Sequence, residues 1–311
     1  MRGKDRIFKI GAIQHIYQNT LDGWLIFYSK RDYLVLFSLI SVAARKYGIQ
    51  IIGLCMMPDH IHILVRAENL QTLSQFVCYY SSLFARANNK TTFRRGQLFR
   101  HSFGSAMKPD DKRCRSVIAY VYNNLVEKRL ADDVESGQWN FLRYARQPYP
   151  FSEKLELAGA SRAMRRAVEE IKGDRKTDIP LNYNQIERIC KDLNRTETAQ
   201  LTDFIIQQYN CIDYEAAFSF FGSYDSFVTS CNAFTGSEYG VGEIHHKASD
   251  IIYGRITDLL RRKYAFHDIK DVFRLEEDKR KKLALAIAKE TGAPLFQIAK
   301  YFHCSTLERD G

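Results

Sequence analysis

The fold is decided by residues 57–65, which read MPDHIHILV. The run of β-branched and apolar residues predicts a strand from His60 to Arg66, and the Pro-Asp pair before it predicts a tight joint. Side chains alternate between the two faces of a strand, so His60 and His62 point to one face and Ile61 to the other. Two imidazoles side by side on a rigid strand can bind a divalent cation, although a lone histidine on an apolar strand is more often a core residue.

The segments around this strand predict one sheet with helices packed against it. Strands are expected at residues 7–18, 24–28, 49–57 and 60–66, with a strand or extended loop at 97–105, and helices at 31–47, 70–88 and 110–130. Gly48 is expected to end the first helix. This order predicts an α+β domain over residues 1–150, a ferredoxin-like antiparallel sheet with helices on one face.

The pattern changes in the second half of the chain. Residues 151–180 are a predicted linker with one helix at 161–172, and residues 181–311 are a predicted, mainly α-helical C-terminal domain. Helices of that domain are expected near residues 184–194, 198–209, 213–220, 224–231, 243–264 and 276–290.

A candidate helix-turn-helix lies near residues 283–303. In one register Gly292 takes the turn and Ile298 a buried position of the motif. In another register residues 297–302 form the first helix and Ser305 begins the second. The alternative is an ordinary amphipathic helix pair, which is consistent with the nearly neutral charge of this half.

The composition is typical of a folded protein of the cytoplasm. The 311 residues are 45% hydrophobic and 26% charged, which supports a full core and excludes a disordered chain. No apolar run approaches the roughly 18 residues that span a bilayer, and the charged start has no signal-peptide pattern, so we expect no membrane partner. The seven cysteines are scattered and form no Cys-x-x-Cys pair, which favours reduced thiols over a zinc ribbon or disulfides.

The positive charge is confined to the first half of the chain. Residues 1–150 hold 22 Lys and Arg against 11 Asp and Glu, whereas residues 151–311 hold 24 against 25, and the whole chain carries +10. A basic surface near the histidine pair predicts a polyanionic partner, because phosphate contacts supply most of the affinity for nucleic acid. The alternative is a generally basic protein whose charges are solvated.

A tyrosine on the third predicted helix is the candidate nucleophile. Residues four apart share a helix face, so Tyr120 lies in one stripe with Ser116, Asn124 and Lys128, and such polar neighbours are not typical of a core position. Tyr122 falls about 200° round the helix and is expected to face elsewhere. Free tyrosine has a pKa of about 10, so a nearby cation or base is needed to activate it at neutral pH.

Together these segments resemble the HUH single-tyrosine transposases, and among them the REP-associated tyrosine transposases. The matching stretches are residues 56–64 and 120–126, the second reading YVYNNLV, in the order and at the spacing of the family. The likeness covers residues 7–145. It implies a metal-dependent DNA strand transferase that acts on single-stranded or hairpin DNA, as a monomer or homodimer.

The resemblance also implies a role for each residue of the site. His60 and His62 would bind Mg²⁺ or Mn²⁺. Tyr120 would form a 5′-phosphotyrosine and free a 3′-hydroxyl. Asn124 would be a third ligand or would orient the nucleophile.

Three positions depart from the family pattern without removing a reacting group. Asp59 stands where asparagine is common, and Tyr122 and Leu125 replace the usual histidine and proline. Asp59 could add a metal ligand, although an aspartate after proline more often caps a turn.

A basic, aromatic segment at residues 97–103 could follow a DNA backbone and stack bases, or it could be an edge strand. The candidate phosphate contacts are Arg94, Arg95, Arg100, Lys108, Lys112, Arg113 and Arg115. The alternative functions are a non-catalytic DNA-binding regulator with the same fold and an unrelated metal-dependent phosphodiesterase. Neither alternative would form a covalent bond with DNA.

Overall fold

The computed structural model describes residues 7–100, 103–234, 249–305 and 307. The elements of the first half are β1 Ile13–Asn19, α1 Lys30–Lys46, β2 Gln50–Met57, β3 His60–Arg66, α2 Leu70–Thr91, β4 Gly104–Lys108, α3 Asp111–Glu127, η1 Gln138–Asn140 and η2 Leu142–Ala145. Those of the second half are α4 Arg162–Lys176, α5 Tyr183–Cys190, α6 Arg195–Tyr209, α7 Tyr214–Phe218, α8 Tyr224–Asn232, α9 Ile251–Arg262, η3 Ile269–Arg274, α10 Glu277–Thr291 and α11 Leu295–Phe302.

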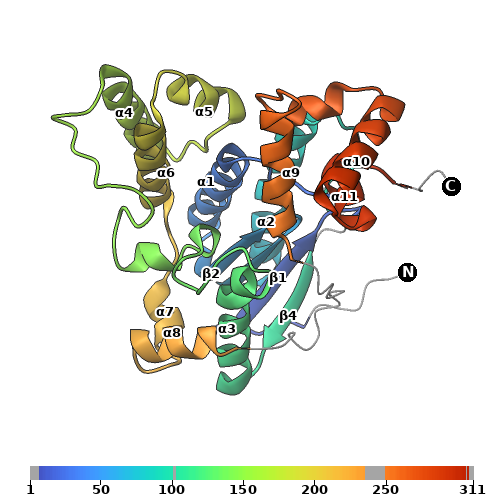
Figure 1. Cartoon of the computed structure of the whole chain (residues 1–311). Coiled ribbons are helices and arrows are strands. Elements are labelled where there is room, and N and C mark those ends of the chain that lie inside the picture. The colour runs from blue at the N-terminus through green and yellow to red at the C-terminus, as the bar shows by residue number, and fades with distance from the viewer. Residues whose placement is uncertain (1–6, 101–102, 235–248, 306, 308–311) are drawn as a thin grey trace.

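The described strands form a four-stranded antiparallel sheet in the order β2-β3-β1-β4. With α1 between β1 and β2 and α2 between β3 and β4, this is the ferredoxin-like arrangement. The predicted α+β class is therefore confirmed, with a mostly helical second half (Figure 1). Helix α1 begins with a capping box between Ser29 and Asp32, and it ends before Gly48, whose φ of +62° suits glycine.

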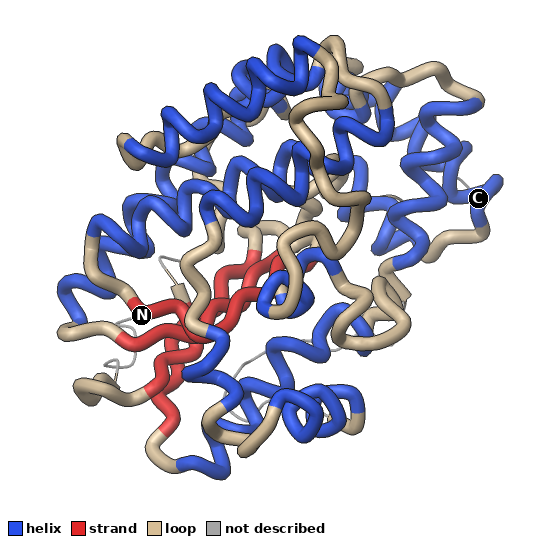
Figure 2. Tube along the Cα trace, turned by 90° about the vertical axis from the view of Figure 1, so that its left-hand side faces the viewer, coloured by secondary structure: helices blue, strands red, loops and turns tan. Residues whose placement is uncertain are grey.

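Helices cover both faces of the sheet, which forms the central layer in Figure 2. On one face, Ile61 and Ile63 of β3 pack with α1 and α2. On the other face, Leu64 of β3 and Ile52 of β2 pack with α3. The prediction that the helices lie on one face is therefore wrong. The physical reason is that β2 is apolar on both faces and Leu64 of β3 adds to the second apolar face, so each face has to be covered.

The predicted strand at residues 24–28 is instead an extended segment beside the sheet. The backbone N–H groups of Ile26 and Phe27 donate to the Pro58 carbonyl at 2.9 and 3.3 Å, and that of Leu25 donates to the Lys300 carbonyl at 3.2 Å. The segment therefore lies between the β2–β3 joint and α11, where its backbone groups are satisfied without a strand partner.

Two strand boundaries also differ from the prediction. β1 spans Ile13–Asn19 rather than residues 7–18, and β4 begins only at Gly104, at the end of the predicted 97–105 segment. Before Gly104, an isolated bridge joins Phe99 to Thr20. The pairing of β1 with β3 and β4 sets these limits, and the local sequence does not predict that pairing.

The C-terminal helices share cores with the N-terminal half. One core joins α1 and α2 to α4, α5 and α6, and a second joins α3 to α7 and α8. A third places Leu25 and Tyr28 among side chains of α9, η3, α10 and α11. The predicted helix 243–264 is described from Ile251, and its residues 243–248 lie outside the described part of the chain. The short element η3 is an addition to the predicted helices, whereas α11 contains residues 297–302 of the candidate helix-turn-helix.

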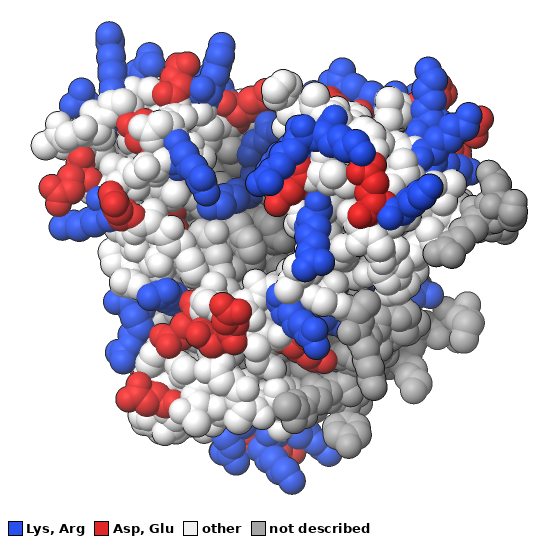
Figure 3. Space-filling view, viewed as in Figure 1, with Lys and Arg blue, Asp and Glu red and all other residues white. Residues whose placement is uncertain are grey.

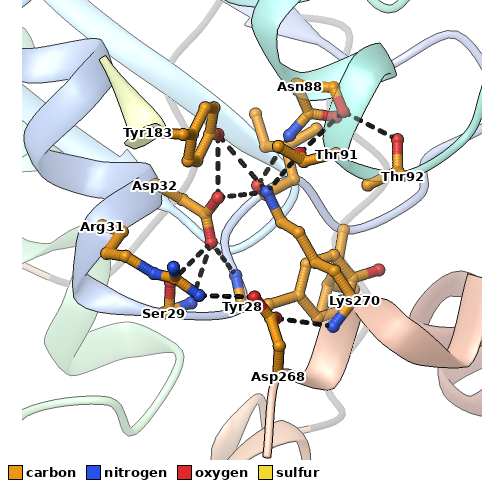
Figure 4. Close-up of polar contacts among 12 residues, drawn as sticks. Tyr28, Ser29, Arg31, Asp32, Asn88, Thr91, Thr92, Tyr183, Asp268 and Lys270 are labelled. Carbon is orange, nitrogen blue, oxygen red and sulfur yellow. Dashed lines mark hydrogen bonds and ion pairs between the residues drawn. The ribbon is translucent and has the colours of Figure 1, made fainter. Parts of the chain in front are cut away.

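A buried ion pair joins η3 to the start of α1 (Figure 4). Lys270 donates to Asp32, whose carboxylate also accepts from the Tyr183 hydroxyl at 2.8 Å and from the Tyr28 backbone N–H at 2.8 Å. Lys270 further donates to the Thr91 hydroxyl at 2.9 Å. Asp32 is fully buried, and its charge is compensated by donors from three segments of the chain.

α10 and α11 pack against each other and are joined by a short turn, with Gly292 at φ +66° ending α10. α11 packs inward through Gln297, Ile298, Tyr301 and Phe302. Only Phe296 of this helix is exposed. The face of α11 that carries these four residues is thus occupied within the molecule.

The surface carries mixed charge, with basic side chains gathered over α9 and α10 in the upper part of Figure 3. Arg255, Arg261 and Arg262 of α9 are exposed there. Among the described residues, none of the helices combines the length and the apolar character that a membrane span requires.

Candidate active site

His60 and His62 lie on the same face of β3, as their alternation predicts. They stand opposite Asn19 and Tyr17 of β1. The two ring centroids are 4.9 Å apart with the planes nearly perpendicular. His62 is fully buried, whereas the His60 side chain is 15% exposed, so the pair runs from the interior to the surface.

A third histidine, His15 of β1, belongs to the same cluster. Its Nε2 lies 3.0 Å from Nδ1 of His62, and the ring centroids are 5.1 Å apart. His15 stands opposite Leu64, two positions along β3 from His62, and therefore faces the same side of the sheet. Sequence reasoning missed His15 because only the β1–β3 register brings it to His62. The alternation of His15 with Tyr17 on an expected strand was the available signal.

The ring of Tyr17 packs against a glycine of the neighbouring strand. Gly104 of β4 stands directly opposite Tyr17, and a Cβ atom there would lie 2.0 Å from Cζ of the tyrosine ring. Glycine is therefore required for Tyr17 to lie over β4 beside His15, whose ring centroid is 5.9 Å away.

α3 brings Tyr120 to the histidine cluster. The N-cap of the helix is Asp110, whose carboxylate accepts from the Arg113 backbone N–H at 2.8 Å. The Tyr120 ring centroid lies 5.4 Å from that of His62 and 6.0 Å from that of His15. Tyr120 is 1% exposed, and the ring of Phe234 lies 6.3 Å from it.

The neighbouring tyrosine faces elsewhere, as its place on the helix predicts. Tyr122 donates to the Ile52 carbonyl at 3.1 Å and packs edge-on against Phe227, 5.1 Å away. Burial raises the pKa of Tyr122 well above its usual value. Of the two tyrosines, Tyr120 is the one that α3 directs to the histidines.

The ring nitrogens have an arrangement that fits a bound cation. Nδ1 of His62 contacts His15, and Nδ1 of His60 lies 2.5 Å from Oδ1 of Asp59. A cation would therefore be held by Nε2 of each ring, the usual pattern when Nδ1 is fixed by a partner within the protein.

Within the residues that the structure describes, a third ligand would be of another type. Across the described ranges, no group of three or more His, Cys, Asp or Glu side chains could hold a metal ion. Asn124 is buried one turn after Tyr120, and its Nδ2 has no hydrogen-bond partner among the residues that the structure describes. Amide orientation is assigned from such bonds, so either the oxygen or the nitrogen of Asn124 can face the site.

Asp59 joins the site to α11. Its Oδ2 accepts from Nζ of Lys300 at 2.8 Å while Oδ1 faces His60. Burial alone would raise the pKa of Asp59, but the charges of His60 and Lys300 hold it well below its usual value. Nearby, burial and the Asp59 charge raise the pKa of Asp250 to about 6, against the lowering effect of Lys128. The contact between Asp59 and Lys300 spans 241 positions and was missed from the sequence.

The candidate phosphate contacts differ in accessibility. Those exposed on the described surface are Arg95, Arg100, Lys112, Arg113 and Arg115. Arg94 instead lies over the Trp24 ring, 4.7 Å from its centroid, with its side chain 14% exposed. Lys108 is buried at the end of β4, and burial lowers its pKa to about 8. The side chains of Arg94 and Lys108 are therefore largely occupied by contacts within the protein.

Comparison with known proteins finds a family match within the first half of the chain. Residues 26–124 match the family described as "Transposase IS200 like". The chain carries an IS200-like transposase domain. The matched range contains His60, His62, Tyr120 and Asn124, whereas His15 and Lys300 lie outside it.

Two known proteins are similar to the region around the IS200-like transposase domain. A "Putative REP-associated tyrosine transposase" of Haemophilus influenzae (strain ATCC 51907 / DSM 11121 / KW20 / Rd) is 24% identical over 120 residues, covering 35% of this chain and 68% of that protein. A solved "Structure of the REP associates tyrosine transposase bound to a REP hairpin" aligns with 52% of this chain and 98% of its own, at 14% identity and a TM-score of 0.39. That TM-score is too low to support a structural argument.

Proposed function

We propose that this protein cleaves and transfers DNA strands through a 5′-phosphotyrosine intermediate, with Tyr120 as nucleophile and Mg²⁺ or Mn²⁺ as cofactor. The observation that carries the proposal is that α3 brings the Tyr120 ring to within 5.4 Å of His62, beside His60 on the same strand. The IS200-like transposase domain, which contains all three residues, supports it. Single-stranded or hairpin DNA is the proposed substrate, as the resemblance of residues 7–145 to the REP-associated tyrosine transposases implies.

In the proposed reaction, Oη of Tyr120 attacks a backbone phosphorus. The phenol gives up its proton, the Oη–P bond forms, the bond from phosphorus to O3′ breaks, and the leaving oxygen takes up a proton to become a 3′-hydroxyl. Attack of a 3′-hydroxyl on the phosphotyrosine reverses these bond changes and joins a new strand, so no external energy source is required.

The histidines and Asn124 would hold the cation at the scissile phosphate. The cation would act as a Lewis acid that neutralises charge on the phosphate oxygens. His15 would fix the ring of His62 through the 3.0 Å contact at Nδ1, and Asp59 would fix that of His60. The exposed cations Arg95, Arg100, Lys112, Arg113 and Arg115 would contact backbone phosphates around the cleaved position.

Cleavage requires the nucleophile to be uncovered. Tyr120 is 1% exposed, and the ring of Phe234, whose carbonyl accepts from Asn123 at 2.8 Å, lies edge-on to it with the ring centroids 6.3 Å apart. Entry of a phosphate group therefore requires the side chains that cover Tyr120 to move, which would keep the phenol protected until DNA binds.

A denaturing gel of the protein with labelled hairpin or single-stranded DNA and Mn²⁺ tests the proposal. The wild type should form a covalent adduct, and mass spectrometry should map it to Tyr120. Tyr120→Phe should bind DNA with similar affinity and form no adduct, and Tyr264→Phe, at a tyrosine that donates to Glu290 outside the site, is the matched control. An adduct with Tyr120→Phe would remove this residue as nucleophile, and binding without any wild-type adduct would favour the non-catalytic regulator.

A further inference from the structure

α11 is fixed to the N-terminal half directly beside the histidine strand. The Lys300 carbonyl accepts from the Leu25 backbone N–H at 3.2 Å, and the Tyr301 carbonyl accepts from the Tyr28 hydroxyl at 2.7 Å. His303 stacks on Trp24 with ring centroids 4.8 Å apart, and its Nε2 lies 2.9 Å from the Leu25 carbonyl. These contacts determine where the Lys300 side chain can reach.

From this position Lys300 completes a chain of three groups that ends at the histidine pair. Its Nζ donates to Oδ2 of Asp59 at 2.8 Å, and Oδ1 of Asp59 lies 2.5 Å from Nδ1 of His60. The side chains of Lys300, Asp59 and His60 are 27%, 15% and 15% exposed. The chain of contacts therefore lies at the partly open edge of the site, where a carboxylate held at one oxygen only could rotate into solvent.

We infer that Lys300 is a positioning residue, through which the C-terminal helical region fixes Asp59 and, through Asp59, the ring of His60. The inference rests on the proposed function in so far as His60 is taken as a cation ligand. With Oδ2 bound to Lys300, Oδ1 of Asp59 is directed at Nδ1 of His60. The proton then stays on Nδ1, and Nε2 is the nitrogen presented to a cation.

The positioning role and a simple charge effect predict opposite results. A lysine near a bound divalent cation repels it, so removal of the Lys300 charge alone would tighten cation binding. Loss of positioning would weaken binding, because His60 would no longer be held in the binding tautomer and orientation. The sign of the change in affinity therefore separates the two explanations.

Lys300→Met is the appropriate variant. A Cβ on Gly23 would lie 3.6 Å from Cε of Lys300, so the aliphatic stem packs against the Gly23 turn, and methionine retains much of that stem. The backbone contacts of α11 through Leu25 and Tyr301 do not depend on the ammonium group. Lys289→Met, at an exposed lysine of α10, is the matched control.

Mn²⁺ binding to the full-length protein without DNA, measured by calorimetry, is the first readout. Lys300→Met should weaken binding about tenfold, the lower end of the range for groups that orient a ligand, whereas Lys289→Met should bind like the wild type. Lys300→Arg should recover much of the affinity, since a guanidinium can still donate to Asp59. In an Asp59→Ala background, Lys300→Met should have no further effect, because the two residues act in series. Equal or tighter binding by Lys300→Met overturns the inference.

The His60 tautomer, measured by ¹⁵N NMR of the metal-free protein, is the second readout. The wild type should carry the proton on Nδ1, and Lys300→Met should show a mixture of tautomers with unchanged circular dichroism. An unchanged tautomer would refute the positioning role. Because this measurement needs neither metal nor DNA, it decides the role of Lys300 even if the wild type fails to bind Mn²⁺ or to form a DNA adduct, which would count against the proposed function alone.

Discussion

Nε2 of His15 on β1 lies 3.0 Å from Nδ1 of His62 on β3, and this contact joins two strands inside the candidate active site. Both histidines are fully buried. The contact fixes Nδ1 of His62 toward His15 on β1, so Nε2 is the nitrogen that would be presented to a cation.

Replacement of His15 should therefore impair the site without removing a proposed ligand. His15→Phe keeps a ring in the core but leaves Nδ1 of His62 without its contact to His15, and we expect Mn²⁺ affinity and adduct formation to fall about 10–100-fold. Calorimetry and the denaturing gel measure the two effects. His267→Phe, at an exposed histidine, should leave both unchanged. Wild-type affinity in His15→Phe would show that the contact is dispensable.

Gly104→Ala should displace Tyr17. The new Cβ would lie 2.0 Å from the tyrosine ring, so either the ring or β4 has to move. We expect the free energy of unfolding, measured by urea denaturation, to fall by about 1–3 kcal/mol, together with loss of adduct formation. Gly159→Ala is the control, because a Cβ there meets no described atom within 4 Å. Equal stability of the two variants would contradict the close packing of the Tyr17 ring against Gly104.

Lys270→Met should destabilise the protein strongly. The substitution leaves the fully buried Asp32 carboxylate without its cation, and loss of one partner of a buried ion pair costs about 3–5 kcal/mol in the free energy of unfolding. Lys263→Met, which breaks a solvent-exposed pair with Glu290, should change stability little. Urea denaturation of both variants provides the comparison, and similar losses would mean that the Asp32 site does not depend on Lys270.

The docking of α11 should make stability depend on pH through His303. Burial lowers the pKa of His303 to about 3, whereas the unfolded chain has a histidine pKa of about 6.5. The unfolded state therefore binds the proton first, so the stabilising contribution is complete above pH 6.5 and is lost as the pH falls towards 3. Between pH 7 and pH 5 this loss amounts to about 2 kcal/mol.

His303→Asn should remove that pH dependence. Asparagine tolerates the left-handed backbone at position 303, where φ is +51°, and it does not titrate. Urea denaturation at pH 7 and pH 5 should show a drop in stability smaller than that of the wild type by about 2 kcal/mol. An unchanged drop would assign the acid sensitivity to other groups.

The sequence predicted the local features of the site better than its long-range contacts. Strand alternation placed His60 and His62 on one face, and helical spacing separated Tyr120 from Tyr122, because both depend only on the backbone period. His15 required the register of β1 against β3, which is set by tertiary pairing. The roles assigned to these residues stay predictions until the variants are measured.

The wrong predictions also result from contacts between residues that are far apart in the sequence. Residues 24–28 have the propensity of a strand, but their backbone groups bond to Pro58 and Lys300 rather than to a neighbouring strand. The helices occupy both faces of the sheet because α3 covers the apolar side that α1 and α2 leave open. Asp59 looked like a turn cap or a ligand, and its partner Lys300 comes from the far end of the chain.

The shared cores set a limit on protein engineering. In a shortened chain ending near residue 150, Leu25, Tyr28 and much of α1 and α3 would lose the side chains that now shield them from water. Newly bared apolar surface of that extent promotes aggregation. A minimal version would need polar substitutions on the outer faces of α1 and α3 before it could be handled in isolation.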